Sequence, residues 1–221
     1  MSALLNTVPF VDTVAVKFPI PLEAVALWRF ASDDSNRPQI GGVLLETKDN
    51  YLTAVATNGH SLVKTVTHLG NNNTHTKLDG VSFLIPAEAF KNIEKEVKAA
   101  KKAGQGVLFS VDVVCGVQRK AVPVAKFTTN TGETRFNLLS ETFPNWRKLV
   151  PEANKKGDAQ AVGINPRYIG DLHTYLKATG NGDFGVCIDP ITDGLSPIRI
   201  TVPSKEALGF EFEAVIMPMR M

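Results

Sequence analysis

The chain has 221 residues, of which 43% are hydrophobic and 21% are charged, as in an ordinary globular protein. Its 24 lysine and arginine residues against 22 acidic residues give a net charge of +2. This balance excludes an acidic tail and a protein that grips nucleic acid by bulk positive charge. Any nucleic-acid role must therefore come from shape or from local placement of charge.

Cysteine content and hydropathy favour a soluble cytoplasmic protein. The two cysteines, Cys115 and Cys187, are too few for a disulfide framework in a chain of this length. Both lie in apolar stretches, so we expect free, half-buried thiols. No stretch approaches the roughly 20 apolar residues of a membrane span, and the N-terminus lacks the features of a secretory signal.

Three segments of the chain share an order of strand, proline, helix and further strands. In the first, residues 13–18 alternate between polar and apolar as in a half-buried strand. Pro21 suits the first turn of a helix over residues 21–32. Strands are then expected at residues 41–47 and 51–57.

The second segment opens with a strand at residues 81–86, followed by a helix that Pro86 begins and Gly104 ends. Four apolar residues recur at helical spacing and predict its buried stripe: Phe90, Ile93, Val97 and Ala100. Strands are expected at residues 107–115, 118–129 and 134–140.

The third segment begins with an expected strand at residues 159–164. Asn165 then caps a predicted helix over residues 166–178, which has proline at its first position. Its apolar stripe consists of Tyr168, Leu172 and Leu176. Strands are expected at residues 184–190, 198–203 and 210–219.

Each segment has one helix and three or four strands, which is typical of an α+β fold with antiparallel sheets and helices on one face. Polar, turn-rich stretches at residues 34–39, 68–80 and 151–158 are expected to be loops. The last of them is the best candidate for a domain boundary.

The sequence carries no catalytic or metal-binding signature. It lacks the phosphate-loop, dinucleotide-binding, nucleophile-elbow and C-x-x-C motifs, and none of its four histidines has metal-ligand spacing. The pair Asp33–Asp34 resembles an acidic site, but the polar end of the first helix explains it more simply. We expect no enzyme activity, no cofactor and no metal.

The second helix carries a row of lysines at i, i+4, i+7 and i+11, which places them on one face: Lys91, Lys95, Lys98 and Lys102. Two interpretations are open from the residues alone. The row is a solvated surface paired with Glu94 and Glu96, or it is a set of ammonium groups directed at a phosphate backbone.

Four stretches together resemble the bacterial β sliding clamp family (DNA polymerase III beta subunit). In chain order they are NRPQIGGVLLE, AVATNGHSLV, FPNWRKLVP and VIMPMRM. The resemblance runs from about Val14 to Met221. The family's subunit has three domains of two similar halves each. By this resemblance, residues 1–151 correspond to the complete middle domain and residues 152–221 to the second half of the last domain.

The resemblance implies a DNA clamp fold, a closed ring with helices lining the hole and sheets outside. Such a ring encircles duplex DNA without reading its sequence, tethers a polymerase and has no catalytic activity. The lysine row would then face DNA, with Arg29, Arg167 and Lys177 as further candidates. Enclosure rather than grip holds such a ring, so a small net charge is compatible with this role.

The family also has a peptide groove between its middle and last domains, which accepts short apolar motifs from polymerases and the clamp loader. Methionine, flexible and polarizable, suits such a surface. The family's Asp and Arg in the turn are replaced here by Asn58 and Ser61. Matched residue by residue, the groove would comprise Arg37, Ile40, Thr57, Gly59, His60, Leu62, Pro151, Asn165, Tyr168, Val215, Met217, Pro218, Met219 and Arg220.

Counting halves suggests an assembly. The family's ring has twelve halves, so three per chain imply a homotetramer, with a trimer as the alternative because two-domain clamp subunits of related families close as trimers. If neighbouring halves alternate in orientation, the ring must be dihedral. A second hypothesis is a clamp relative that forms no ring and acts as a peptide-binding decoy or regulator of polymerase and clamp loader.

Overall fold

The computed structural model describes residues 13–70, 80–104, 110–116, 124–129, 132–151, 162–189, 195–202 and 209–219. Its helices and strands follow in this order: β1 (Thr13–Phe18), α1 (Leu22–Ala26), β2 (Gly42–Lys48), β3 (Tyr51–Thr57), β4 (Ser61–His68), β5 (Ser82–Pro86), α2 (Ala87–Lys102), β6 (Ser110–Gly116), β7 (Val124–Thr129), β8 (Gly132–Asn137), α3 (Pro166–Ala178), β9 (Cys187–Ile188), β10 (Ile198–Thr201) and β11 (Glu211–Ile216). The mixture of helices and antiparallel strands confirms the predicted α+β class.

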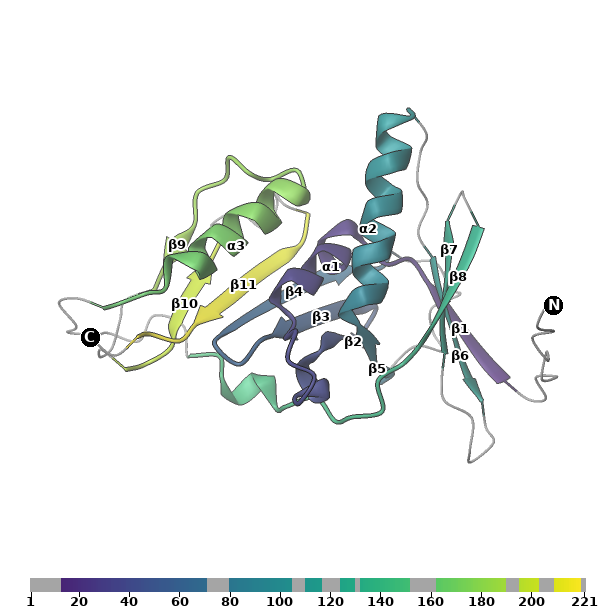
Figure 1. Ribbon diagram of the computed structural model, residues 1–221, viewed down its shortest axis with the longest axis horizontal. Coiled ribbons are helices and arrows are strands. Elements are labelled where there is room, and N and C mark those ends of the chain that lie inside the picture. Colours follow the sequence, from purple (N-terminus) through teal and green to yellow (C-terminus); the bar gives the residue numbers. More distant parts are fainter. Residues whose placement is uncertain are drawn as a thin grey trace.

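The strands form two antiparallel sheets. One has the order β1-β6-β7-β8, and the other has the order β5-β2-β3-β4-β11-β10-β9. The four-stranded sheet lies at one end of the long axis, α3 and β9–β11 lie at the other, and α1 and α2 lie between them (Figure 1). The longer sheet therefore joins parts of the chain that are far apart in sequence.

We define three units by their elements: the first is β1, α1 and β2–β4, the second is β5, α2 and β6–β8, and the third is α3 and β9–β11. The first two units exchange their leading strands, because β1 pairs with β6 and β5 pairs with β2. The third unit joins the first through the pairing of β11 with β4.

One core connects the three units on the sheet face that the helices cover. Phe90 of α2 packs edge-to-face on Phe127 of β7, with ring centroids 6.0 Å apart, and so links the two sheets. Tyr175 of α3 is fully buried, stacks on Phe212 and donates its hydroxyl hydrogen to the carbonyl oxygen of Glu23 at 3.1 Å. Burial of a side chain of this size stabilises the fold by about 2 kcal/mol.

The second and third helices form where the sequence predicts them. The N-cap at Asn165 is confirmed, because its Oδ1 accepts a hydrogen bond from the backbone N–H of Arg167 at 3.0 Å. The first helix is shorter than the predicted range of 21–32. After α1 the backbone tightens into a 3₁₀ turn over Leu27–Phe30, which directs both of its end residues into the core.

The strands differ more from expectation. β4 was not predicted, because polar residues such as Ser61 and Lys64 interrupt its apolar pattern. β9 is shorter than the predicted 184–190, and Cys187 on it is exposed rather than half-buried, because this edge strand is covered on neither face. Predicted strand residues 118–123 and 159–161 lie outside the described residues, as does the side chain of Cys115.

Candidate functional site

Predicted groove residues meet at the seam between β4 and β11. Leu62 lies opposite Val215 in the antiparallel register, and both are buried. Ile40, which follows the first helix, joins them in a small apolar cluster with Phe143 and Trp146 from the segment after β8. Their sequence neighbours in the strands belong to the main core, so this cluster lies on the sheet face opposite the helices.

The C-terminal segment continues from β11 along this seam. The backbone N–H of Met217 donates to the carbonyl oxygen of His60 at 2.8 Å, and that of Met219 donates to the carbonyl oxygen of Gly163 at 2.9 Å. The two methionine side chains remain 40% and 51% exposed. Their backbone is thus held while their flexible side chains face solvent.

The turn between β3 and β4 is held by its own side chains. Asn58 accepts hydrogen bonds at its Oδ1 from the backbone N–H groups of His60 and Ser61, both at 2.9 Å. Thr57 donates its hydroxyl hydrogen to the carbonyl oxygen of Ser61 at 2.8 Å. The amide of Asn58 therefore supports the turn.

Arg37 lies against this turn. Gly59 has φ +90°, a conformation that favours glycine, and a Cβ at this position would lie 3.0 Å from Nη1 of Arg37. The Nε of Arg37 donates to Oδ2 of Asp34 at 3.0 Å. The pKa of Asp34 is lowered by the hydrogen bond from the backbone of Asn36 and by that from Arg37. The carboxylate of Asp34 therefore stabilises the loop in which it lies by accepting hydrogen bonds from Asn36 and Arg37.

The start of α3 completes the predicted set. The rings of Tyr168 and His60 stack with centroids 6.4 Å apart and planes inclined by 17°. Pro151 and Pro218 are half-buried. Arg220 lies outside the described residues.

A cavity of about 580 Å³ lies between the helices and the β3–β4 turn. It brings predicted groove residues together with predicted DNA-facing residues. Its lining includes Trp28, Arg29, Arg37, Asn58, His60, Lys91, Lys95, Arg167 and Tyr168. The cavity is therefore rich in positive charge and has aromatic walls.

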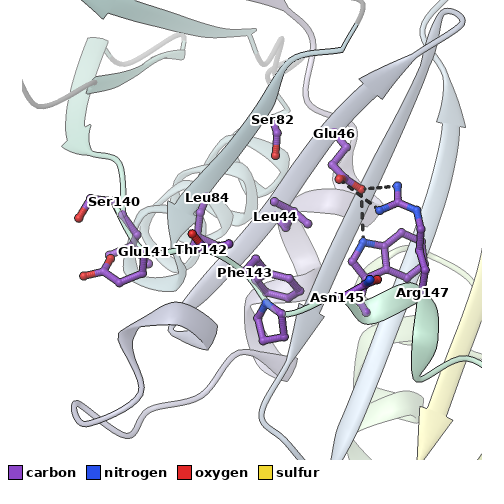
Figure 2. A pocket seen from close by; sticks show the side chains of 13 residues that line it. Leu44, Glu46, Ser82, Leu84, Ser140, Glu141, Thr142, Phe143, Asn145 and Arg147 are labelled. Atoms are coloured by element: carbon purple, nitrogen blue, oxygen red, sulfur yellow. Dashed lines mark hydrogen bonds and ion pairs between the residues drawn. The ribbon is translucent and has the colours of Figure 1, made fainter. Parts of the chain in front are cut away.

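A second cavity of about 580 Å³ lies between β2, β5 and residues 139–147. Figure 2 shows Glu46 at its edge, where the carboxylate accepts hydrogen bonds from Trp146 Nε1 at 3.3 Å and Arg147 Nη2 at 2.8 Å. Leu44 and Phe143 belong both to its lining and to the small apolar cluster. None of the predicted groove residues lines this second cavity. In the sequence, the aromatic residues of the stretch FPNWRKLVP are the feature that points to it.

The lysine row is exposed on α2, and the predicted apolar stripe of this helix is buried. Lys98 Nζ lies 3.1 Å from Glu94 Oε1, and Lys91 Nζ lies 5.5 Å from the centroid of the Trp28 ring. Lys95 and Lys102 make no ion pair with any residue that the structure describes. Lys98 is thus the one lysine of the row that is paired with a carboxylate among the described residues.

The other three predicted DNA-facing residues differ in how far their side chains are exposed to solvent. Arg29 is paired with Glu94, and its side chain is only 10% exposed. Burial raises the pKa of Glu94, but hydrogen bonds from Arg29, Trp28 and Lys98 together lower it below its usual value. The charge of Arg29 is thus balanced inside the protein. Arg167 and Lys177 are exposed on α3.

Within the described ranges, no three His, Cys, Asp or Glu side chains gather as a metal site would require. No helix in those ranges is long and apolar enough to cross a membrane.

No protein-family model and no curated protein matches the sequence. Solved structures do match. The DNA polymerase III beta subunit of Thermotoga maritima has a TM-score of 0.68 at 16% identity, over 99% of this chain and 69% of that one. The DnaN sliding clamp of Bartonella birtlesii bound to griselimycin has a TM-score of 0.69 at 14% identity, over 98% and 68%. A sliding clamp from Pseudomonas aeruginosa has 0.66 at 16%, over 99% and 70%. This chain therefore has the fold of the β sliding clamps.

Proposed function

We propose that this protein is a cytoplasmic sliding clamp, which encircles duplex DNA, tethers a replicative DNA polymerase and catalyses no reaction. The observation that carries the proposal is a match to clamp structures over 99% of the chain. In this proposal residues 1–151 form a complete clamp domain and residues 152–221 form half of another.

The helix face supports the DNA role. All three helices pack on the same side of the seven-stranded sheet, so their solvent-facing sides share one surface. The exposed cations on it include Lys95, Lys102, Arg167 and Lys177. Cations in such a surface attract phosphates without reading bases, which suits a ring that must slide.

Topological retention tests this function. Chains dissociated by dilution are mixed with nicked circular duplex DNA, concentrated to reassemble and filtered through a sizing column in high salt. We expect protein to remain with the circle, because salt weakens phosphate contacts but not enclosure. Cutting the circle once should release it. Equal retention on circular and linear DNA, or no retention by reassembled oligomers, would contradict the proposal.

The seam between β4 and β11 supports the peptide role. Two exposed methionines lie beside a turn and an apolar cluster, a combination that accepts varied apolar peptides. We propose that motifs of the polymerase and clamp loader bind there. If a peptide of this kind binds while no ring is retained on DNA, the decoy or regulator role replaces the clamp role.

Substitution of both methionines tests the groove. Met217→Ala with Met219→Ala should weaken binding of a polymerase-derived peptide about thirtyfold, because about 2 kcal/mol of apolar contact is lost. Fluorescence anisotropy measures this affinity. Tyr51→Ala is the matched control, since Tyr51 is 46% exposed at the far end of β3 from the turn. Unchanged affinity of the methionine variant would discredit the groove.

A further inference from the structure

The end of the molecule formed by the third unit carries an exposed apolar surface outside both candidate sites. Among the described strands, β9 is the outermost strand of the seven-stranded sheet. Phe184, Val186 and Ile188, which lead into and through it, are 38%, 42% and 52% exposed. Their spacing of two residues is that of side chains on one side of a strand. Natural proteins protect such edges, because an open apolar strand pairs readily with another chain.

The helix above this edge is also incompletely covered. Tyr168 and Tyr175 of α3 direct their rings toward the first unit, where they contact His60 and Phe30. Ile169 lies about 100° around the helix from Tyr168, on the flank turned away from the first unit. It is 44% exposed. The apolar surface therefore includes both β9 and the outer flank of α3.

The first and second units show how this fold covers the equivalent surfaces. β5 of the second unit closes the edge of the first unit's sheet at β2, and β1 returns to close the edge at β6. α1 packs against α2 at the same junction. Among the described elements, no strand closes the edge at β9 and no helix covers the outer flank of α3.

The linker between the second and third units has no room for a further unit. Only residues 152–161 separate the described segments that end at Pro151 and begin at Val162. A stretch of this length is too short for a helix and three strands. This linker therefore cannot supply the strand and the helix that would cover the surface around β9.

We propose that this surface, consisting of β9, Phe184, Val186 and Ile169, binds the same surface of a second copy of the chain about a two-fold axis. The two third units then cover each other's exposed apolar surface and close each other's sheet edge at β9. In a two-fold interface one patch supplies both sides, so an apolar patch meets an apolar patch.

The other end of the molecule argues against a head-to-tail arrangement. β8 is the outer edge of the four-stranded sheet, and its residues Gly132 to Arg135 are all exposed and largely polar. Charged residues on an edge strand oppose pairing with an apolar partner. The polar edge at β8 is thus a poor partner for the apolar surface around β9, whereas two copies of the β9 surface are both apolar.

Charge placed in the patch tests the interface. Ile188→Lys and Ile169→Lys should each halve the mass found by light scattering without DNA, because the charge is buried only when the interface forms. Both residues are exposed in the single chain, so each variant should still fold with the wild-type secondary structure. Leu149→Lys, at a site 47% exposed outside the third unit, is the control and should keep the wild-type mass.

A wild-type monomer at the highest soluble concentration, or wild-type mass in both patch variants, would overturn the inference. Loss of mass in the control as well would also overturn it. The mass measurement contains no DNA. A negative result would therefore concern the interface alone, whereas retention on circular DNA tests the clamp function.

Cross-linking tests the two-fold arrangement. Cys187 is exposed on β9 beside Ile188. In a Cys115→Ala chain, a short bis-maleimide should join two chains through Cys187. Head-to-tail contact between β9 and β8 would leave the oligomer intact but give no such product, and this result would overturn the two-fold axis.

Discussion

Glu213 is the residue at which the third unit is tied electrostatically to the first. Its side chain is 7% exposed, and its carboxylate lies 2.6 Å from Lys64 Nζ of β4 and also accepts a hydrogen bond from Arg199 of β10. Burial raises the pKa of Glu213, but Lys64 and Arg199 together lower it below its usual value of 4.5. A nearly buried carboxylate with two cations stabilises the seam only while it is ionised.

We expect Glu213→Gln to lower the free energy of unfolding by about 2 kcal/mol at neutral pH, since two cations lose a charged partner. The lowered pKa means that the ionised carboxylate stabilises the fold above pH 4.5 and that this contribution is lost as pH falls further. Denaturant unfolding should therefore show the two proteins converging below that pH.

The control for this prediction is Glu133→Gln. Glu133 also pairs with a lysine, Lys126 at 2.7 Å, but its side chain is 48% exposed. An exposed pair stabilises little, so this variant should resemble the wild type. An equal loss for Glu213→Gln at acidic and neutral pH would mean that shape, not charge, holds the seam.

At the scale of the element, α2 combines two functions on opposite faces. Its apolar stripe links both sheets, and its lysine row faces solvent. Within the row, Lys98 is engaged by Glu94, whereas Lys95 and Lys102 are not engaged by any described residue. The latter two should therefore make the larger contribution to DNA affinity.

Lys95→Ala with Lys102→Ala tests this distinction. Two lost phosphate contacts should reduce the slope of log affinity against log salt concentration by about 2. Fluorescence anisotropy with short duplex DNA measures the slope. Lys101→Ala removes one positive charge from the same helix but off the row, and it should change the slope by less than half as much. Equal effects per lysine would show that only total charge matters.

At the scale of the whole molecule, the two ends differ in chemistry. β8 and β9 lie at opposite ends of the molecule (Figure 1). The exposed edge at β8 is largely polar, whereas the exposed surface around β9 is apolar. Closure of a ring requires both ends to be occupied. If each end meets its own counterpart, the assembly is dihedral and contains an even number of chains.

We therefore expect a homotetramer, since four chains of three units supply the twelve halves of a clamp ring. In the absence of DNA, light scattering should give four times the chain mass of 24.0 kDa. A mass of three chains would support the trimeric alternative and contradict dihedral closure. A stable monomer or dimer at working concentration would rule out a ring.

Features with local causes were predictable from sequence. Helical spacing placed the buried stripe of α2, and Asn165 followed by proline located the start of α3. The resemblance drew attention to the turn at Asn58 and to the methionines, which the structure brings to one seam. The sequence by itself thus determined the fold class and two of the three helices, and the resemblance named several residues that lie at this seam.

Tertiary structure alone decided how the units join. Strand exchange between units, the pairing of β4 with β11 and the exposure of Cys187 all depend on contacts between distant residues. β4 was missed because Lys64 breaks its apolar pattern, and that lysine is tolerated only because Glu213 lies beside it. Arg29 likewise resembles a free cation until Glu94, far along the chain, is placed against it. Local signals specify elements, whereas long-range pairing decides which surfaces are buried and which remain open to a partner.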